Sequence, residues 1–169
     1  EENANEATTN VFIKSLGEAS ALTQLTDSGT ASLPAWSPDG TKIAYLEKDD
    51  SGVKQVFIQL AAGSADNNSD RVALTSQIAE VDAFAWSPDA TKIAFRALVP
   101  GKDELAAIDA EPGMPDIKVA RRIRYRQDGV GWRGDSFYHL FVLNIASKEV
   151  TQITSGEGDD STPNWSPDG

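Results

Sequence analysis

Cysteine is missing from the 169-residue chain, and histidine occurs once, as His139. The absence of cysteine excludes disulfides, thiolate chemistry and cysteine-based zinc sites. A single histidine excludes a multi-histidine metal site within the chain. We expect a soluble protein. The lack of cysteine fits a reducing compartment, so the cytoplasm is slightly favoured over the periplasm. The sequence predicts neither a metal nor a cofactor.

Long apolar runs and an excess of positive charge are missing as well. No run of about 18 apolar residues occurs, so the sequence offers no membrane-spanning helix. The formal net charge is -11. Nucleic acids and anionic membranes attract clustered positive charge, and we therefore expect neither as a partner.

The chain does contain a short unit that recurs. AWSPDGTKIAY begins at Ala35, AWSPDATKIAF begins at Ala85, and NWSPDG begins at Asn164. Serine, proline, aspartate and glycine in this order predict a tight turn. Ala90 replaces the glycine in the second copy, which costs about 1 kcal/mol if the position needs a positive φ. The repeat residues that we expect to be structural are Trp36, Pro38, Asp39, Gly40, Trp86, Pro88, Asp89, Trp165, Pro167 and Asp168.

A second signal keeps the same phase as the turn unit. Short apolar runs typical of strands, at 11–13, 56–58 and 140–142, are each followed by a threonine, and the threonines are Thr26, Thr75 and Thr154. These threonines precede the next tryptophan of the turn unit by 10, 11 and 11 residues. Units of about fifty residues with four short strands predict a β-propeller, whose blades bury their faces only against neighbouring blades.

The predicted fold is all-β, a partial β-propeller of two complete four-stranded blades plus parts of two others. Residues 1–10 are expected to be a polar tail, and 11–169 the propeller, divided into 11–26, 33–75, 83–154 and 162–169, with an insertion at about 98–136. Since propellers usually close with four to eight blades, we expect the chain to be a piece of a longer polypeptide. Bare blade faces would favour self-association of an isolated piece, which leaves a homo-oligomer open.

The repeated tryptophans have two interpretations. An aromatic side chain at a recurring strand position can stack on a ligand, or it can pack between blades. Packing is far more frequent in repeat architectures, so we predict that Trp36, Trp86 and Trp165 belong to the core.

The W-S-P-D-G-x-x-I-A-[YF] unit resembles the PD40 or TolB-type propeller repeat, and this resemblance spans nearly the whole chain after the first ten residues. The repeat occurs in TolB-like periplasmic interaction propellers. It also occurs in the N-terminal propellers of serine peptidases of the prolyl oligopeptidase family. The resemblance implies the fold more strongly than the function.

The insertion favours the peptidase interpretation. The second complete blade is 34 residues longer than the first, when Trp86 to Phe141 is compared with Trp36 to Phe57. The extra segment contains VARRIRYRQDGVGW at 119–132, ahead of a HLFV strand, and is similar to acylaminoacyl-peptidase-type members. The resemblance implies further blades and a C-terminal α/β-hydrolase domain in the same polypeptide, with the propeller filtering the access of short peptides. The alternative is a TolB-like scaffold for protein–protein interaction that has no catalytic domain.

No catalytic residue is predicted within this chain. The G-x-S-x-G turn that presents a nucleophilic serine is absent, so the chain by itself is not expected to be an enzyme. His139 alternates with Phe137 and Phe141 in an apolar strand. We therefore expect it to be a packed or hydrogen-bonded core residue rather than a general base.

Positive charge is concentrated in one segment. Residues 116–133 have six basic and two acidic side chains. If 119–126 is extended, Arg122, Arg124 and Arg126 share one face, where guanidinium groups could bind peptide carboxylates or acidic groups of a hydrolase domain. These three are the candidate substrate-gating residues. The alternative is a solvated strand with exposed ion pairs of little energetic value.

Overall fold

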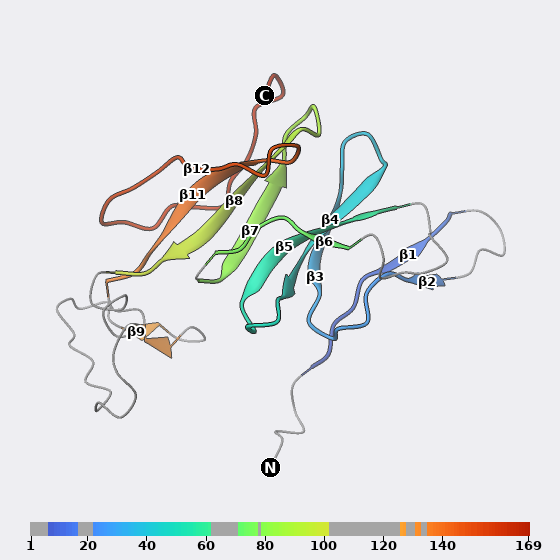
Figure 1. Ribbon diagram of the computed structural model, residues 1–169, viewed down its shortest axis with the longest axis horizontal. Coiled ribbons are helices and arrows are strands. Elements are labelled where there is room, and N and C mark those ends of the chain that lie inside the picture. Colours follow the sequence, from blue (N-terminus) through green and yellow to red (C-terminus); the bar gives the residue numbers. More distant parts are fainter. Residues whose placement is uncertain are drawn as a thin grey trace, which may run out of the picture.

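The computed structural model describes residues 7–16, 22–61, 71–77, 79–101, 126–127, 131–132 and 135–169. Within these residues every regular element is a β-strand (Figure 1). None of the described segments forms a helix that is long and apolar enough to cross a bilayer. The prediction of an all-β fold is confirmed.

Four strands form the sheet that we call blade one. They are β3 (Ser32–Trp36), β4 (Lys42–Lys48), β5 (Lys54–Leu60) and β6 (Val72–Ala73). The strands are antiparallel and lie in chain order, β3-β4-β5-β6. The Ser-Pro-Asp-Gly unit joins β3 to β4, so the predicted turn lies between two paired strands.

Blade two repeats this arrangement with an insertion. Its strands are β7 (Val81–Trp86), β8 (Lys92–Val99), β11 (Phe137–Asn144) and β12 (Val150–Gln152). Their order in the sheet is β7-β8-β11-β12. Both blades have a register shift in the first strand, between Ser32 and Ala35 and between Val81 and Ala83. The two complete blades of the prediction are therefore present.

Two smaller sheets complete the described structure. Strands β1 (Phe12–Lys14) and β2 (Leu22–Gln24) pair with each other, as do β9 (Arg126–Gln127) and β10 (Gly131–Trp132). The segment 162–169, in which we expected a further blade to start, is described throughout and contains a turn but no strand.

The main core lies between the two blades, whose sheets stand face to face in Figure 1. Alternate residues of β4 and β5 pack against alternate residues of β8 and β11. This core cluster contains Ala44, Leu46, Val56, Ile58, Leu74, Val81, Ile93, Phe95, Ala97, Phe141 and Leu143. Each blade therefore buries an apolar face only because the other blade covers it.

A second core lies on the opposite face of blade one, against β1 and β2. It contains Val11, Leu25, Ala31, Ile43, Tyr45 and Phe57. Blade one is thus the middle layer, and residues 43–47 of β4 and 55–59 of β5 are buried without interruption. In β11 buried and partly buried residues alternate from His139 onward, because the face of blade two that points away from blade one is less covered.

Candidate functional site

The predicted gating arginines lie mostly outside the described part of the structure. Arg122 and Arg124 are not described, and of Arg126 only the backbone in β9 is, where it pairs with Trp132 of β10. Whether the three guanidinium groups share one face therefore stays a prediction.

The two ends of the insertion meet in a narrow stem. Val99, at the end of β8, pairs with Phe137, at the start of β11. Next to this pair the Gly101 amide donates to Ser136 Oγ at 3.3 Å. A Cβ on Gly101 would lie 2.6 Å from the Cβ of Asp135 and 2.8 Å from its carbonyl carbon. A side chain at position 101 would therefore force the backbone of Asp135 to shift. The insertion departs from the end of the β8–β11 pair.

Each complete copy of the repeat turn is organised by its aspartate. Ser37 Oγ donates to Asp39 Oδ1 at 2.5 Å, and the amide of Thr41 donates to the same oxygen at 3.0 Å. The serine hydroxyl of the first copy also accepts from the Lys42 amide at 2.9 Å. The hydrogen bond from Ser37, followed by those from Thr41, lowers the pKa of Asp39 to about 2.

The second copy has the same hydrogen bonds. Ser87 Oγ donates to Asp89 Oδ1 at 2.7 Å and the Thr91 amide donates at 3.1 Å, so the pKa of Asp89 is also lowered to about 2. Ala90 has a φ of 57°, close to the 69° of Gly40. The turn therefore needs a left-handed residue at this position, and the second copy accepts the strain. These residues support a structural role and show no binding geometry.

The tryptophans connect successive copies of the repeat. The Trp86 indole Nε1 donates to the Ala35 carbonyl at 3.2 Å, and Trp165 Nε1 donates to the Ala85 carbonyl at 3.1 Å. In both cases the acceptor is the residue that precedes the tryptophan of the previous copy. We call this contact the indole–carbonyl contact.

The prediction that all three tryptophans are core residues is wrong for Trp36. Its side chain is 53% exposed, whereas Trp86 and Trp165 are partly buried. The physical reason is that, among the described residues, no strand lies against Trp36. Trp86, by contrast, lies against β3 and donates to the carbonyl of Ala35.

The recurring threonines hold the third strand of each unit. Thr75 Oγ1 accepts from the Val56 amide at 2.9 Å and donates to Gln55 Oε1 at 2.7 Å. Thr26 accepts from the amide of Val11 and Thr154 from the amide of Leu140, both at 2.8 Å. The regular spacing of these threonines was visible in the sequence. Only the structure shows that each threonine hydroxyl accepts a hydrogen bond from an amide at the third strand, a contact that we call the threonine clasp.

His139 is buried, as expected, and is held by an acidic residue. Its side chain is 5% exposed, and its Nδ1 lies 3.1 Å from Asp160 Oδ2. Thr154 donates to the same carboxylate oxygen, and this hydrogen bond, with a smaller contribution from His139, lowers the pKa of Asp160. Hydroxyl and imidazole thus both face the carboxylate. A nucleophilic site needs the hydroxyl to contact the imidazole, so this group is a structural one.

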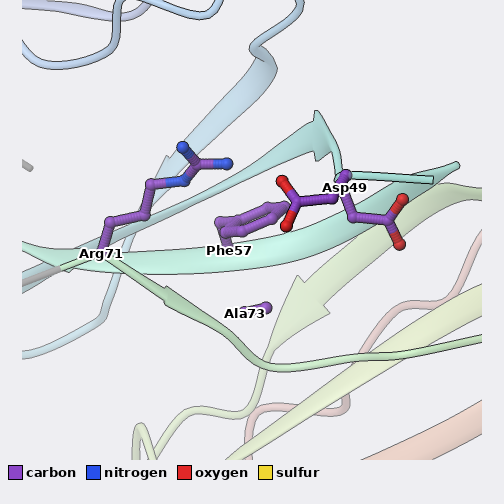
Figure 2. Close-up of a pocket in the computed structure, with 5 residues that line it drawn as sticks. Asp49, Phe57, Arg71 and Ala73 are labelled. Atoms are coloured by element: carbon purple, nitrogen blue, oxygen red, sulfur yellow. The ribbon is translucent and has the colours of Figure 1, made fainter. Parts of the chain in front are cut away.

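A shallow pocket lies beside β5 and β6, lined by Asp49, Asp50, Phe57, Arg71 and Ala73 (Figure 2). The Arg71 guanidinium carbon lies 4.3 Å from the centroid of the Phe57 ring, and Figure 2 shows the ring between Arg71 and Asp49. Sequence reasoning missed this grouping, because Arg71 follows a polar stretch of sequence without any recognisable motif.

Arg71 is held in place by a buried carboxylate. Its Nε lies 2.9 Å from Oε2 of Glu47, whose side chain is 1% exposed. The two atoms form an ionic contact without the alignment of a hydrogen bond. Burial, followed by the charge of Glu47, raises the pKa of the adjacent Tyr45 to about 12. A buried carboxylate needs a paired charge, so Arg71 anchors the short strand β6 to the blade.

Among the described residues, no group of three or more histidine, aspartate or glutamate side chains is arranged to hold a metal ion. The described sites thus consist of repeat turns, clasps, indole–carbonyl contacts and one ion-paired pocket. All of them stabilise sheets or the junctions between sheets.

Two sequence comparisons connect the chain with peptidases. Residues 7–74 match the family model of the dipeptidyl peptidase IV (DPP IV) N-terminal region. Over 138 residues the chain is 24% identical to the uncharacterized peptidase YuxL of Bacillus subtilis (strain 168), an alignment that covers 80% of this chain and 20% of that protein.

Solved structures share the fold. Pyrococcus horikoshii acylaminoacyl peptidase superposes with a TM-score of 0.61 and 16% identity, over 84% of this chain and 20% of that one. TolB from Acinetobacter baumannii gives a TM-score of 0.54 and 18% identity, over 88% of this chain and 27% of that one. The chain thus spans about a fifth of the length of the peptidases it matches. It is a β-propeller segment with TolB-type repeats, related to the N-terminal propellers of prolyl oligopeptidase family serine peptidases.

Proposed function

We propose that this chain is a non-catalytic part of the propeller of a serine peptidase of the prolyl oligopeptidase family, similar to acylaminoacyl peptidases. In this proposal the propeller limits the access of short peptides to an α/β-hydrolase domain outside this chain, and the remaining blades and that domain are its partners. The observation that carries the proposal is the match to YuxL, because it extends over 138 residues. A match of that length cannot be confined to a single fifty-residue repeat, and the matched protein is named a peptidase.

The stem of the insertion supports a gating role. Gly101 and Ser136 hold the two ends of the insertion together at one end of blade two. A segment with a local excess of positive charge can attract the carboxylate of a peptide if it lies beside the route to a catalytic site. We propose that Arg122, Arg124 and Arg126 have this role.

The peptidase proposal is tested on the whole protein that contains this chain. A fluorophosphonate reagent labels serine nucleophiles that a neighbouring base activates. We expect stoichiometric labelling of one serine outside residues 1–169, with parallel loss of hydrolysis of acylated peptides. A protein that is neither labelled nor hydrolytic would contradict the proposal.

The gating proposal is tested with the triple variant Arg122→Gln, Arg124→Gln, Arg126→Gln. We expect kcat/KM for short peptides with a free carboxylate to fall about 10-fold and to change little for their amides, since one lost charge-assisted contact is worth about 1.5 kcal/mol. The matched control replaces three exposed lysines, Lys14, Lys48 and Lys92, by glutamine and changes the net charge equally. Equal effects on acids and amides, or equal effects of the two triple variants, would contradict gating by these arginines.

A TolB-like scaffold for protein–protein interaction is the second candidate. It is favoured by the superposition on Acinetobacter baumannii TolB, which covers 88% of this chain. The labelling experiment discriminates between the two, because a scaffold without a hydrolase domain has no activated serine.

A further inference from the structure

Each threonine clasp also fastens the connection that leaves its unit. Before β1, Asn10 Oδ1 accepts from the Thr26 hydroxyl at 3.3 Å and from the Gly29 amide at 3.0 Å. In blade one, Gln55 Oε1 accepts from the Thr75 hydroxyl at 2.7 Å and from the amide two residues later at 3.1 Å. In both units the acceptor is a neutral side-chain amide that directly precedes the clasped residue.

Blade two closes the equivalent place with the opposite arrangement. His139 stands where the other units have the side-chain amide, directly before the clasped Leu140. The acceptor is now the carboxylate of Asp160, which lies on the connection. Its Oδ2 accepts from the Thr154 hydroxyl and lies 3.1 Å from His139 Nδ1. We call His139, Thr154 and Asp160 the carboxylate clasp, because it depends on an ionisable acceptor.

The carboxylate clasp lies among backbone contacts that hold the same connection on β11. The Asp160 amide donates to the Tyr138 carbonyl at 2.9 Å, and the Tyr138 amide donates to Asp159 Oδ1 at 3.0 Å. Arg96 Nη1 donates to the Asp160 carbonyl at 3.1 Å. The connection continues to Trp165, so these contacts hold the start of the path from blade two to the last copy of the repeat.

We propose that the carboxylate clasp is an acid-sensitive switch, in which protonation of Asp160 releases residues 155–162 from β11 while blade one keeps its own connection. Hydrogen bonds to an ionised acceptor are roughly twice as strong as those to a neutral one, so protonation weakens the bonds from Thr154 and His139. The side-chain amides of the other two units have no carboxylate to protonate. The imidazole Nδ1 can donate in both of its charge states, so the carboxylate is the group that switches.

The surrounding charges leave the carboxylate as the deciding group. Among the described residues, the other charged groups at this end of blade two are Asp82, Arg96, Asp135, Glu157, Asp159 and, at the junction with blade one, the pair Lys54 and Glu80. The hydrogen bond from Thr154, together with His139, lowers the pKa of Asp160 from 3.8 against the opposing charge of Asp159. The folded state therefore prefers the ionised form. This contribution is complete above about pH 4 and is lost as the pH falls through the lowered pKa.

The test is hydrogen exchange of the whole protein that contains this chain, followed from pH 6 to pH 2 and resolved to single amides by mass spectrometry. Each rate is divided by the intrinsic rate at that pH. The reporters are the amides of Leu140 and Asp160 in blade two and those of Val56 and Gln77 in blade one. We expect the blade-two amides to lose protection about 10-fold at a pH at which the blade-one amides are unchanged, because a local opening exchanges without global unfolding.

Three variants identify the titrating group. Asp160→Asn keeps an acceptor oxygen but cannot be protonated in this range, so both blades should stay protected to the same pH. His139→Gln supplies the side-chain amide that blade one has at Gln55, and it should keep the acid-sensitive loss because Asp160 is unchanged. Asp27→Asn is the matched control, since it makes the same exchange at an exposed position after Thr26 and should behave like the parent chain.

The proposal is overturned if both blades lose protection at the same pH, because the event would then be global unfolding. It is also overturned if the blade-two amides keep full protection down to pH 2. An acid-sensitive loss that persists in Asp160→Asn, or that disappears in His139→Gln, would assign the titration to the imidazole and contradict the proposal. None of these results bears on the peptidase proposal, which the serine labelling tests separately.

Discussion

A single carboxylate organises each W-S-P-D turn at the scale of the residue. Asp39 and Asp89 accept hydrogen bonds from the preceding serine and from the following threonine. Ser37 and Ser87 are buried, while both carboxylates lie at the surface. Proline restricts φ at the start of the turn, and a residue with positive φ ends it. The hydrogen bonds of the aspartate therefore stabilise a backbone whose conformation is already restricted.

The low pKa of both aspartates makes stability depend on pH. Each pKa is lowered from 3.8 to about 2 in the folded chain, so the folded state prefers the ionised form. This contribution is complete above about pH 4 and is lost as the pH falls toward 2. We expect Asp39→Asn, Asp89→Asn to flatten the fall of the urea midpoint between pH 4 and pH 2. A double variant with the parent slope would contradict this account.

The left-handed position can be exchanged between the two turns. Gly40 has a φ of 69° and no atom within 4 Å of the place that a Cβ would occupy, whereas Ala90 holds a φ of 57° with a side chain. We expect Gly40→Ala to lower the free energy of unfolding by about 1 kcal/mol and Ala90→Gly to raise it by up to about 1 kcal/mol. Urea denaturation at neutral pH measures both, and changes of equal sign would be inconsistent with the proposed strain.

At the scale of the element, the edges of each blade are stabilised by contacts that lie outside its long strands. The threonine clasps hold the third strand, Arg71 anchors β6 through Glu47, and the stem at Gly101 holds the insertion. Such contacts matter because β6 has two residues and β12 has three, too few to hold an edge by ladder hydrogen bonds alone.

The stem gives a direct test of close backbone approach. Gly101→Ala places a methyl group against the backbone of Asp135, and we expect it to lower the free energy of unfolding by about 1–3 kcal/mol. Gly158→Ala is the matched control, because nothing lies within 4 Å of its Cβ position. Both variants are compared by urea denaturation. If they differ by less than about 0.5 kcal/mol, the stem does not constrain the backbone as described.

At the scale of the whole molecule, a residue is buried only if the neighbouring sheet is present. Phe12, Phe57 and Phe141 occupy equivalent places, each directly after a clasped residue. Phe57 and Phe141 are 5% and 7% exposed, whereas Phe12 is 49% exposed. The β1–β2 sheet, blade one and blade two thus form consecutive layers, and blade one is covered on both faces.

Two substitutions at equivalent positions measure this dependence. Phe141 stacks on Phe95 with ring centroids 5.2 Å apart, and we expect Phe141→Ala to cost about 3–5 kcal/mol. Phe12→Ala removes a half-exposed ring and should cost roughly 1 kcal/mol or less. Thermal and urea unfolding of the two variants provide the comparison. Similar losses would show that burial in this chain does not depend on the adjacent sheet.

Much of the fold was predictable because the repeat is periodic. The W-S-P-D turns and the threonines that follow in phase predicted two four-stranded blades, and the predicted relationship to prolyl oligopeptidase family propellers and TolB-type repeats is confirmed. The exposure of Trp36 was not predictable, since a repeat pattern treats all copies as equivalent. The gating arginines stay a prediction, because most of that segment lies outside the described residues.

The sequence by itself determined the turns and the order of the strands, because proline, glycine and short apolar runs act on the local backbone. The sequence also shows that these 169 residues contain no G-x-S-x-G nucleophile turn, because that turn is a contiguous motif. Only the tertiary structure decided which tryptophan is covered, which threonine closes which strand, and that Arg71 pairs with Glu47 over Phe57. These contacts join residues that are distant in the chain, and their geometry depends on how the sheets pack together.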